Sequence, residues 1–173
     1  MIIMLNGSFG VGKTTTAIAL VQRLPNAHLF DPEDVGLFAR HLTSGLRHDA
    51  EETDDFQDIQ IWPSLTVSTA HQLYHCYGRS LIIPMTLVKP TVLEPIRQGL
   101  SAIAPTFHFC LSASLEIIQQ RLHTRGDGPG SWAWRKAAQY VPQLQAPSYA
   151  RHLDTERHSV SEIVEQILVH STQ

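Results

Sequence analysis

The chain has 173 residues, of which 43% are hydrophobic and 17% charged, and its formal net charge is -3. This composition excludes a disordered chain and a coiled coil, and the length fits one domain with a real hydrophobic core. We expect no nucleic acid as the main partner, because phosphate backbones require clustered Lys and Arg and the sequence has no such block. No apolar stretch approaches the roughly 20 residues that span a membrane.

The cysteines and the first residues favour a cytoplasmic protein. Neither Cys76 nor Cys110 belongs to a C-x-x-C pair, so we interpret both as reduced core thiols. The opening run 1–5 is too short for a signal peptide and leads directly into a glycine-rich loop. The 10 histidines show no metal-binding spacing, and we interpret them as surface or core residues.

Short apolar runs alternate with helical patterns along the chain, which is typical of an α/β domain with a parallel sheet. In chain order, we expect strands at about 2–5, 27–30, 80–85, 106–111 and 152–154. Helices are expected at about 13–24, 32–45, 62–77, from 91, 115–124, from 134 and 160–168. Right-handed crossovers place helices on both faces of such a sheet. The predicted fold is therefore a three-layer α/β domain with a five-stranded parallel sheet.

Capping-box spacing marks the start of two of these helices. Ser159 with Glu162 precedes the last helix, and Thr91 with Glu94 indicates a short helix after the third strand. The helix at 62–77 is expected to bury one face, formed by Trp62, Leu65, Leu73 and Tyr77.

The most specific motif is Gly-Ser-Phe-Gly-Val-Gly-Lys-Thr at 7–14, which matches G-x-x-x-x-G-K-[ST] between an expected strand and an expected helix. Its glycines let backbone N–H groups turn toward a β-phosphate, and the helix N-terminus adds positive potential. Lys13 is expected to reach the β- and γ-phosphates, and the Thr14 hydroxyl to ligate Mg²⁺. The expected cofactors are ATP and Mg²⁺, and the expected binding residues are Gly7, Ser8, Phe9, Gly10, Val11, Gly12, Lys13, Thr14 and Thr15.

An acid at the end of the second strand is a candidate for the chemistry. Carboxyl ends of parallel strands gather at the ligand edge of a sheet, so Asp31 is expected near the phosphates. We interpret it as a catalytic and substrate-binding general base for an acceptor hydroxyl, or as an outer-shell Mg²⁺ partner. The alternative is that Asp31 only starts the Asp-Pro-Glu turn. The third strand ends without an acid, so the second Mg²⁺ anchor stays open.

Arg121 and Arg125 share one helix face directly before the glycine-rich loop 126–131. Cations that close over a transferring phosphoryl group stabilise its charge, and a glycine-rich segment supplies a hinge. The alternative is that the two arginines only complement the helix dipole. We assign both a catalytic role in a lid at about 125–135, in which Arg135 is a further candidate.

The acceptor is expected to bind in the helical segment at about 36–79. Arg40 is a candidate for binding an anionic or polar substrate. Trp62, Tyr74 and Trp132 are candidates for stacking on a base, although aromatic residues at helical spacing usually form core; Trp62 is assigned to the substrate. With the P-loop and the lid, these segments make up one domain over residues 1–173.

Further motifs extend over nearly the whole chain. They are Asn6 through Thr14, Asp31-Pro32-Glu33, Gly36, Arg40, Asp55-Phe56-Gln57, Trp62, Ile83-Pro84-Met85-Thr86, Arg121-Leu122, Thr124-Arg125 and Ser131-Trp132-Ala133. With these motifs the sequence resembles the tunicamycin-resistance protein family, small P-loop proteins similar to nucleoside monophosphate kinases and to chloramphenicol phosphotransferase. The resemblance implies a P-loop NTPase fold and an ATP-binding protein that protects a bacterium against a uridine-containing antibiotic. A longer C-terminal tail is associated with membrane in that family, but this chain ends at Gln173, so we expect no membrane attachment.

Two functions from different classes remain open at this point. The first is a kinase acting on a nucleoside-like or other hydroxyl-bearing small molecule. The second is an ATP-dependent binding protein that sequesters a drug without chemistry. A regulatory GTPase or motor ATPase is disfavoured, because the sequence has neither an N-K-x-D guanine signature nor a D-x-x-G switch after the P-loop.

Overall fold

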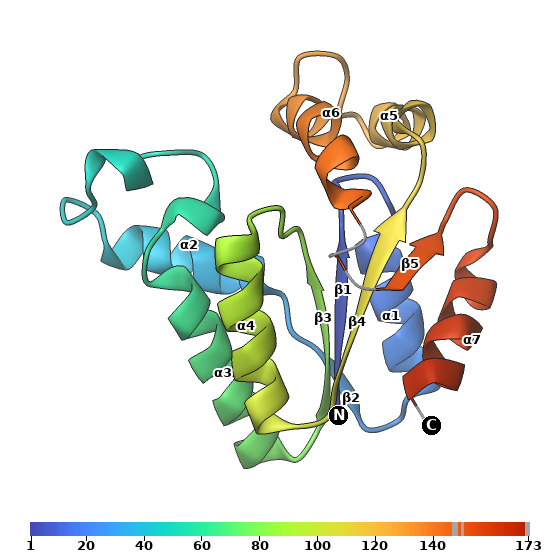
Figure 1. Ribbon diagram of the computed structural model, residues 1–173, viewed down its shortest axis with the longest axis horizontal. Helices are drawn as coiled ribbons and strands as arrows, with labels where there is room; N and C mark the ends of the chain where they lie inside the picture. The colour runs from blue at the N-terminus through green and yellow to red at the C-terminus, as the bar shows by residue number, and fades with distance from the viewer. Residues whose placement is uncertain (147–148, 150, 172–173) are drawn as a thin grey trace.

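A parallel sheet forms the centre of the computed structural model, which describes residues 1–146, 149 and 151–171 (Figure 1). Its strand order is β2-β3-β1-β4-β5, and every neighbouring pair is parallel. The strands are β1 (Ile2–Gly7), β2 (Ala27–Leu29), β3 (Ser80–Met85), β4 (Thr106–Ser112) and β5 (Arg151–Asp154). The five-stranded parallel sheet predicted from the sequence is confirmed.

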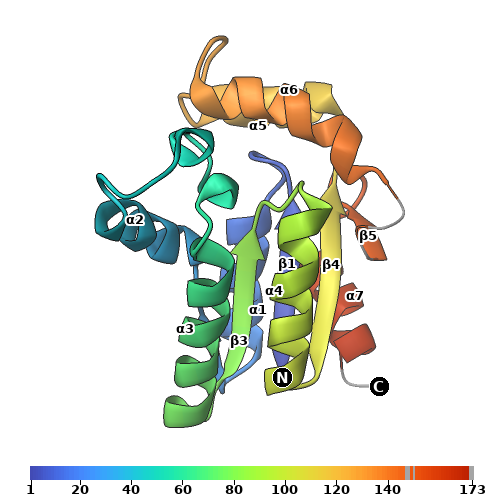
Figure 2. The same ribbon diagram turned by 60° about the vertical axis from the view of Figure 1, so that its left-hand side comes forward.

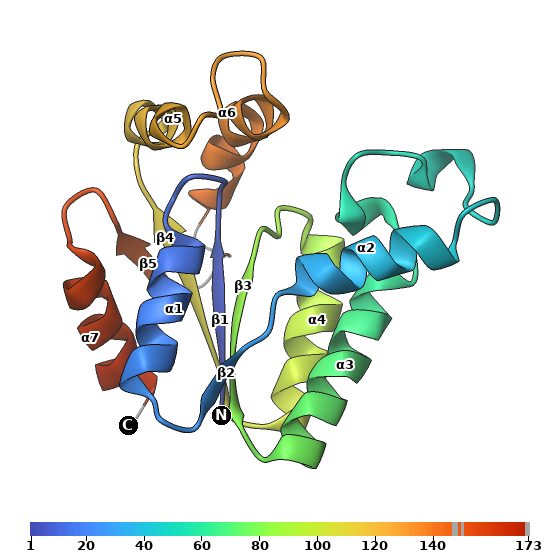
Figure 3. The same ribbon diagram turned by 180° about the vertical axis from the view of Figure 1, so that it is seen from behind.

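Helices cover both faces of this sheet. One face carries α1 (Lys13–Arg23) and α7 (Val160–Ser171), and the other carries α2 (Pro32–Leu42), α3 (Trp62–Tyr77) and α4 (Pro90–Ile103) (Figure 3). Beyond the carboxyl ends of the strands lie α5 (Leu115–Thr124) and α6 (Trp132–Leu144) (Figure 2). Two short 3-10 turns, η1 (Asp49–Glu51) and η2 (Phe56–Asp58), connect α2 to α3. Within the described part of the chain, no helix is both long and apolar enough to cross a membrane.

The alternation of side chains along β1 explains why its sequence is apolar throughout. Ile2 and Met4 pack with the helices of the α2–α4 face, whereas Ile3 and Leu5 pack with the α1–α7 face. All four are fully buried, and each such side chain contributes roughly 1.5–3 kcal/mol to the hydrophobic stabilisation of the fold. A central strand buried on both faces holds the loop that follows it in a fixed position.

The helix after β3 differs from the sequence prediction. It is the long helix α4, which begins at Pro90 with Lys89 as an N-cap that makes no side-chain cap bond. Glu94 pairs with Arg97 at 2.7 Å instead of closing a capping box with Thr91. The predicted box was wrong because proline is favoured at the first helical position, so the helix starts at Pro90. The capping box of Ser159 and Glu162 before α7 is confirmed.

The buried face of α3 also differs in part from the prediction. Trp62 is buried, but Tyr77 is 71% exposed and Cys76 is exposed as well, so neither belongs to the core. The other fully packed positions are Thr66 and Ala70, a polar and a small residue that hydrophobicity alone does not identify. Cys110 is buried as expected, and burial raises the pKa of its thiol to about 12.

Candidate functional site

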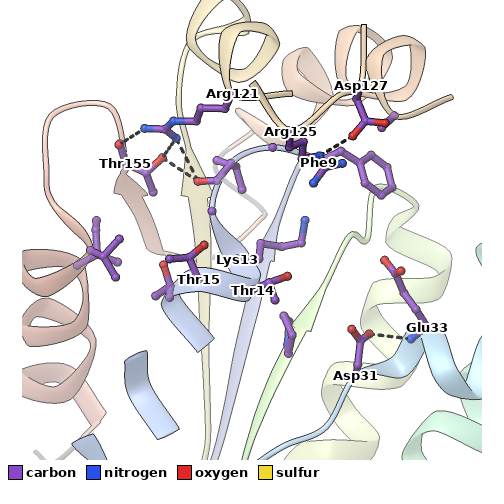
Figure 4. A pocket seen from close by; sticks show the side chains of 18 of the residues that line it. Phe9, Lys13, Thr14, Thr15, Asp31, Glu33, Arg121, Arg125, Asp127 and Thr155 are labelled. Atoms are coloured by element: carbon purple, nitrogen blue, oxygen red, sulfur yellow. Dashed lines mark hydrogen bonds and ion pairs between the residues drawn. The ribbon is translucent and has the colours of Figure 1, made fainter. Parts of the chain in front are cut away.

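The P-loop connects β1 to α1 at the carboxyl edge of the sheet (Figure 4). Gly10 and Gly12 have φ angles of 77° and 104°, a left-handed backbone that favours glycine. At Gly10 a Cβ atom would also lie 2.9 Å from the Cγ atom of Leu122 on α5. The glycines of the motif therefore serve both the curl of the loop and the close approach of α5.

A cavity of about 810 Å³ opens over this loop, in the size range of ligand sites. Its walls are the loop itself, the start of α2, the end of α5 and the start of α7. Lys13 lines the cavity and donates from Nζ to the carbonyl oxygen of Ser8 at 2.9 Å. Burial lowers the pKa of Lys13 to about 8. The cavity is the only place where the described chain gathers a P-loop lysine, hydroxyls and backbone N–H groups for a nucleotide.

The oxygen donors in this cavity fit Mg²⁺. Thr14 and Thr15 line it together with the carboxylates of Asp31 and Glu33. Hydroxyl and carboxylate oxygens suit Mg²⁺, which usually takes few protein ligands and fills its shell with phosphate oxygens and water. Among the residues described, no group of three His, Cys, Asp or Glu side chains could hold a metal by itself. The arrangement fits a metal shared between Thr14 and a bound nucleotide.

Asp31 and Glu33 face Lys13 from the start of α2 (Figure 4). Asp31 caps the helix, because its Oδ1 atom accepts a hydrogen bond from the Glu33 N–H at 3.0 Å. Partial desolvation raises the pKa of both carboxyls, and at Glu33 the like charge of Asp31 raises it further. Asp31 thus starts the turn and also lines the cavity. The sequence analysis did not identify Glu33 as a site residue, although the Asp-Pro-Glu motif places it directly after Asp31 and Pro32.

The guanidinium of Arg121 connects two loops of the cavity. It donates to the carbonyl oxygen of Val11 at 3.3 Å and to the carbonyl oxygen of Thr155 at 2.6 Å. The Thr155 hydroxyl also donates to the Val11 carbonyl oxygen at 3.0 Å. Figure 4 shows Arg121 turned toward Thr155 and away from Lys13. Arg121 therefore holds the P-loop against the segment between β5 and α7.

Arg125 lies on the Lys13 side of the cavity, whereas Arg121 is turned toward Thr155 (Figure 4). It lines the cavity and forms an ion pair with Asp127, with Nε and Oδ2 2.5 Å apart. Its positive charge contributes to the lowered pKa of Lys13. Arg135, the further lid candidate, is exposed and lines neither this cavity nor the next one described.

A second cavity, of about 230 Å³, adjoins the first. Phe9, Glu33 and Trp132 line both cavities, so they mark the place where the two meet. The remaining walls come from five separate parts of the chain and are Pro32, Asp54, Asp55, Phe56, Gln57, Trp62, Met85, Thr86 and Tyr140. Most of these residues belong to the motifs that carry the family resemblance, which was the available signal for this cavity.

Of three residues that the sequence predicts to bind the substrate, only one lines a cavity. Trp62 lines the second cavity but is 3% exposed, and its Nε1 donates to the carbonyl oxygen of Pro32 at 3.0 Å. Arg40 lines neither cavity; its guanidinium carbon lies 4.6 Å from the centre of the Phe56 ring, behind the cavity wall. Tyr74 also lies outside both cavities, where it packs against the core of the α2–α4 face.

Helix α6 is fastened to the acidic segment between α2 and α3. Trp132 donates from Nε1 to Asp54 at 2.5 Å, and Lys136 forms an ion pair with Asp54 at 2.9 Å. Tyr140 donates its hydroxyl hydrogen to Asp55. We call these three contacts the latch, and they join walls of the second cavity, since Asp54, Asp55, Trp132 and Tyr140 all line it.

Comparisons with known proteins agree with this geometry. A family model described as an AAA domain matches residues 2–157. The structure is similar to the Deinococcus radiodurans tunicamycin resistance protein, with a TM-score of 0.77 and 25% identity over 98% of this chain and 94% of that one. It is also similar to a gluconokinase from Sinorhizobium meliloti, with a TM-score of 0.67 and 15% identity over 98% and 90% of the two chains.

A third similar structure is a shikimate kinase from Acinetobacter baumannii, with a TM-score of 0.62 and 17% identity over 99% and 94% of the two chains. A search of curated proteins found no match. The resemblance to the tunicamycin-resistance family is confirmed, and the fold is that of small P-loop kinases, a group that binds nucleotides. From the P-loop geometry and the extent of the family match, the chain belongs to the AAA-domain family.

Proposed function

We propose that the protein is an ATP- and Mg²⁺-dependent phosphotransferase that acts on a hydroxyl group of a small molecule. The observation that carries the proposal is the position of Glu33, a carboxylate shared by the two adjoining cavities. A base at the junction of a phosphate cavity and a second ligand cavity is what transfer between two bound molecules requires. ATP is assigned to the larger cavity and the acceptor to the smaller one.

In the proposed reaction, P-loop N–H groups and Lys13 hold the β- and γ-phosphates of ATP. Arg125 exchanges Asp127 for the oxygens of the γ-phosphoryl group. The acceptor oxygen bonds to the γ-phosphorus while the bond to the β,γ-bridging oxygen breaks, and the acceptor proton goes to Glu33. The products are ADP and a phosphorylated acceptor.

The remaining site residues have supporting roles in this proposal. Thr14 would hold Mg²⁺, which neutralises phosphate charge when bound. Asp31 lines only the nucleotide cavity, which favours the outer-shell metal role over the base role that the sequence also left open. Arg121 fixes the shape of the loop at Val11. The segment at 36–79 and the lid at 125–135, continued by α6, enclose the acceptor.

The proposed acceptor is a uridine-type nucleoside antibiotic, phosphorylated on a sugar hydroxyl. The 25% identity to a tunicamycin resistance protein over 98% of the chain supports this choice. Mass spectrometry of tunicamycin incubated with the protein and ATP-Mg²⁺ tests it, beside expression in a sensitive host. A phosphate adduct is expected. Resistance in the host without modified drug would favour sequestration instead.

Glu33→Gln tests the role of the base directly. We expect kcat to fall by roughly 10²–10⁴-fold, the usual contribution of general-base catalysis, while ATP still binds. The raised pKa of Glu33 should appear as a rise of kcat/KM with pH, and the Lys13 pKa near 8 as a fall above it. The rising limb should vanish in the variant.

Asp34→Asn is the matched control, since Asp34 is the next acid of α2 and lines neither cavity. Near-normal kcat in Glu33→Gln, or equal losses in the two variants, would refute the assignment of Glu33. Asp31→Asn is expected to lose less activity than Glu33→Gln and to require more Mg²⁺ for half-maximal rate.

A further inference from the structure

The acceptor cavity has a one-sided distribution of charge. Glu33, Asp54 and Asp55 line it, and no Lys or Arg occurs among the described residues of its walls. Lys13 and Arg125 line the nucleotide cavity and not this one. A ligand in the smaller cavity therefore meets three carboxylates in walls without Lys or Arg, and of these Asp54 is paired with Lys136 from outside the walls.

Besides Lys13, whose Nζ lies 5.4 Å from the centre of the Phe9 ring, two cations outside these walls contact wall residues. Lys136 pairs with Asp54, and its Nζ lies 5.7 Å from the centre of the Trp132 ring and 5.6 Å from that of Tyr140. Arg40 lies against Phe56, 4.6 Å from the ring centre, and bonds to the carbonyl oxygen of Thr53 at 3.4 Å. Both cations are thus engaged by residues of the cavity wall, Arg40 by the ring of Phe56 and Lys136 by Asp54.

The other walls suit a flat, uncharged ring. Five aromatic side chains line the cavity, namely Phe9, Phe56, Trp62, Trp132 and Tyr140, and of these Phe9, Phe56 and Trp132 are exposed enough for a ring to stack on. The hydroxyl oxygen of Thr86 is buried and has no hydrogen-bond partner within the part of the chain that the structure describes. Thr86 thus keeps an unused hydrogen-bonding group at the cavity wall, where buried polar groups normally find a partner.

We infer that the acceptor is a ring-bearing alcohol without an anionic group, and that this cavity discriminates against phosphorylated and carboxylated molecules. An anion would require Arg or Lys partners, whereas like charges brought together across a binding site are strongly unfavourable. A neutral or amine-bearing ring meets no such penalty. That the ligand is a phosphate acceptor rests on the proposed function, whereas the selection by charge concerns binding alone.

Three uridine compounds that differ only at the 5′ position test the inference. They are uridine, the cationic 5′-amino-5′-deoxyuridine and the anionic uridine 5′-monophosphate. Quenching of tryptophan fluorescence reports binding without turnover, because Trp62 and Trp132 line the cavity. Saturating ADP-Mg²⁺ keeps the monophosphate out of the nucleotide cavity.

We expect uridine and the amine to bind, and the monophosphate to bind more than about 100-fold more weakly. Equal or tighter binding of the monophosphate would overturn the inference, as would the failure of all three to bind. If the ligands bind with this preference but incubation with ATP-Mg²⁺ instead of ADP-Mg²⁺ gives no phosphorylated product, the proposed function is refuted and the charge selection stands. Transfer of phosphate to the monophosphate would do the reverse.

Asp54→Lys locates the source of the discrimination. Asp54 is exposed on its outer side, so the variant is expected to fold, and its preference for uridine over the monophosphate should fall about tenfold. Asp49→Lys is the control, because Asp49 is an exposed acid of the same segment that lines neither cavity. An unchanged preference in Asp54→Lys, or the same loss in both variants, would refute the inferred role of the lining charge.

Discussion

The two cavities on either side of Phe9 are built in opposite ways. The nucleotide cavity takes its longest continuous stretch of wall, residues 9–16, from the P-loop and the first turn of α1, and it contains Lys13 and Arg125. The acceptor cavity is assembled from separate segments and contains carboxylates and aromatic rings. The comparison teaches that phosphate binding can be encoded locally, because it needs backbone N–H groups and a cation, whereas recognition of an acceptor depends on the tertiary structure.

Lys13→Ala should have the largest effect on activity, and it should impair the nucleotide cavity while sparing the acceptor cavity. Losing the cation at the β- and γ-phosphates weakens both ATP binding and the transition state, so we expect kcat/KM to fall by roughly 10³-fold or more. Steady-state kinetics and ATP titration measure this loss. Uridine binding and the thermal unfolding temperature should stay near those of the parent protein. Loss of acceptor binding as well would mean that the cavities are not independent.

Arg125→Ala is expected to reduce kcat by about 100-fold, the size reported for one group that stabilises transition-state charge. The exposed position of Arg125 and its ion pair with Asp127 imply little effect on folding. Arg135→Ala serves as the control, as an exposed arginine of the neighbouring helix that lines neither cavity. Equal rates of phosphate transfer in the two variants, measured by rapid-quench kinetics, would contradict the catalytic assignment of Arg125.

Tyr140→Phe tests the acceptor cavity alone, and it should have the smallest effect on activity of the three variants. The change removes one hydrogen bond to a carboxylate in the latch, which is worth roughly 1.5 kcal/mol. The acceptor KM should rise about tenfold while the KM for ATP stays constant. Tyr77→Phe, on an exposed tyrosine of α3, is the control. A matching increase in the KM for ATP would show that the latch serves both cavities.

Much of the fold and the nucleotide cavity could be predicted from the sequence. The run 2–5 is apolar because both faces of β1 are covered, and the P-loop spacing is a local pattern. The exact face of α3 could not be predicted, since its buried side uses Thr66 and Ala70 while Tyr77 faces solvent. Packing against α4 decides this face: Val67 lies so close that a Cβ atom on Gly99 would be 2.7 Å from it.

The acceptor cavity shows where sequence reasoning ended. The sequence predicts that Arg40 binds the substrate, yet Arg40 lines neither cavity and its guanidinium lies against the Phe56 ring. Asp54 and Tyr140 were not considered, because residues so far apart in the chain gave no local pattern. Glu33 could have been predicted, since the sequence places Asp31 at the ligand edge and the two residues share the first turn of α2.

The latch between α6 and the acidic segment has a consequence for experiments in living cells. The latch holds Asp54 and Asp55, two walls of the acceptor cavity, so we expect the residence time of a ligand there to depend on the opening rate of the latch. A variant that holds a drug long enough lowers its free concentration even if no bond is ever made. Survival on an antibiotic plate therefore reports dwell time together with turnover, and only the chemical state of the recovered drug separates the two.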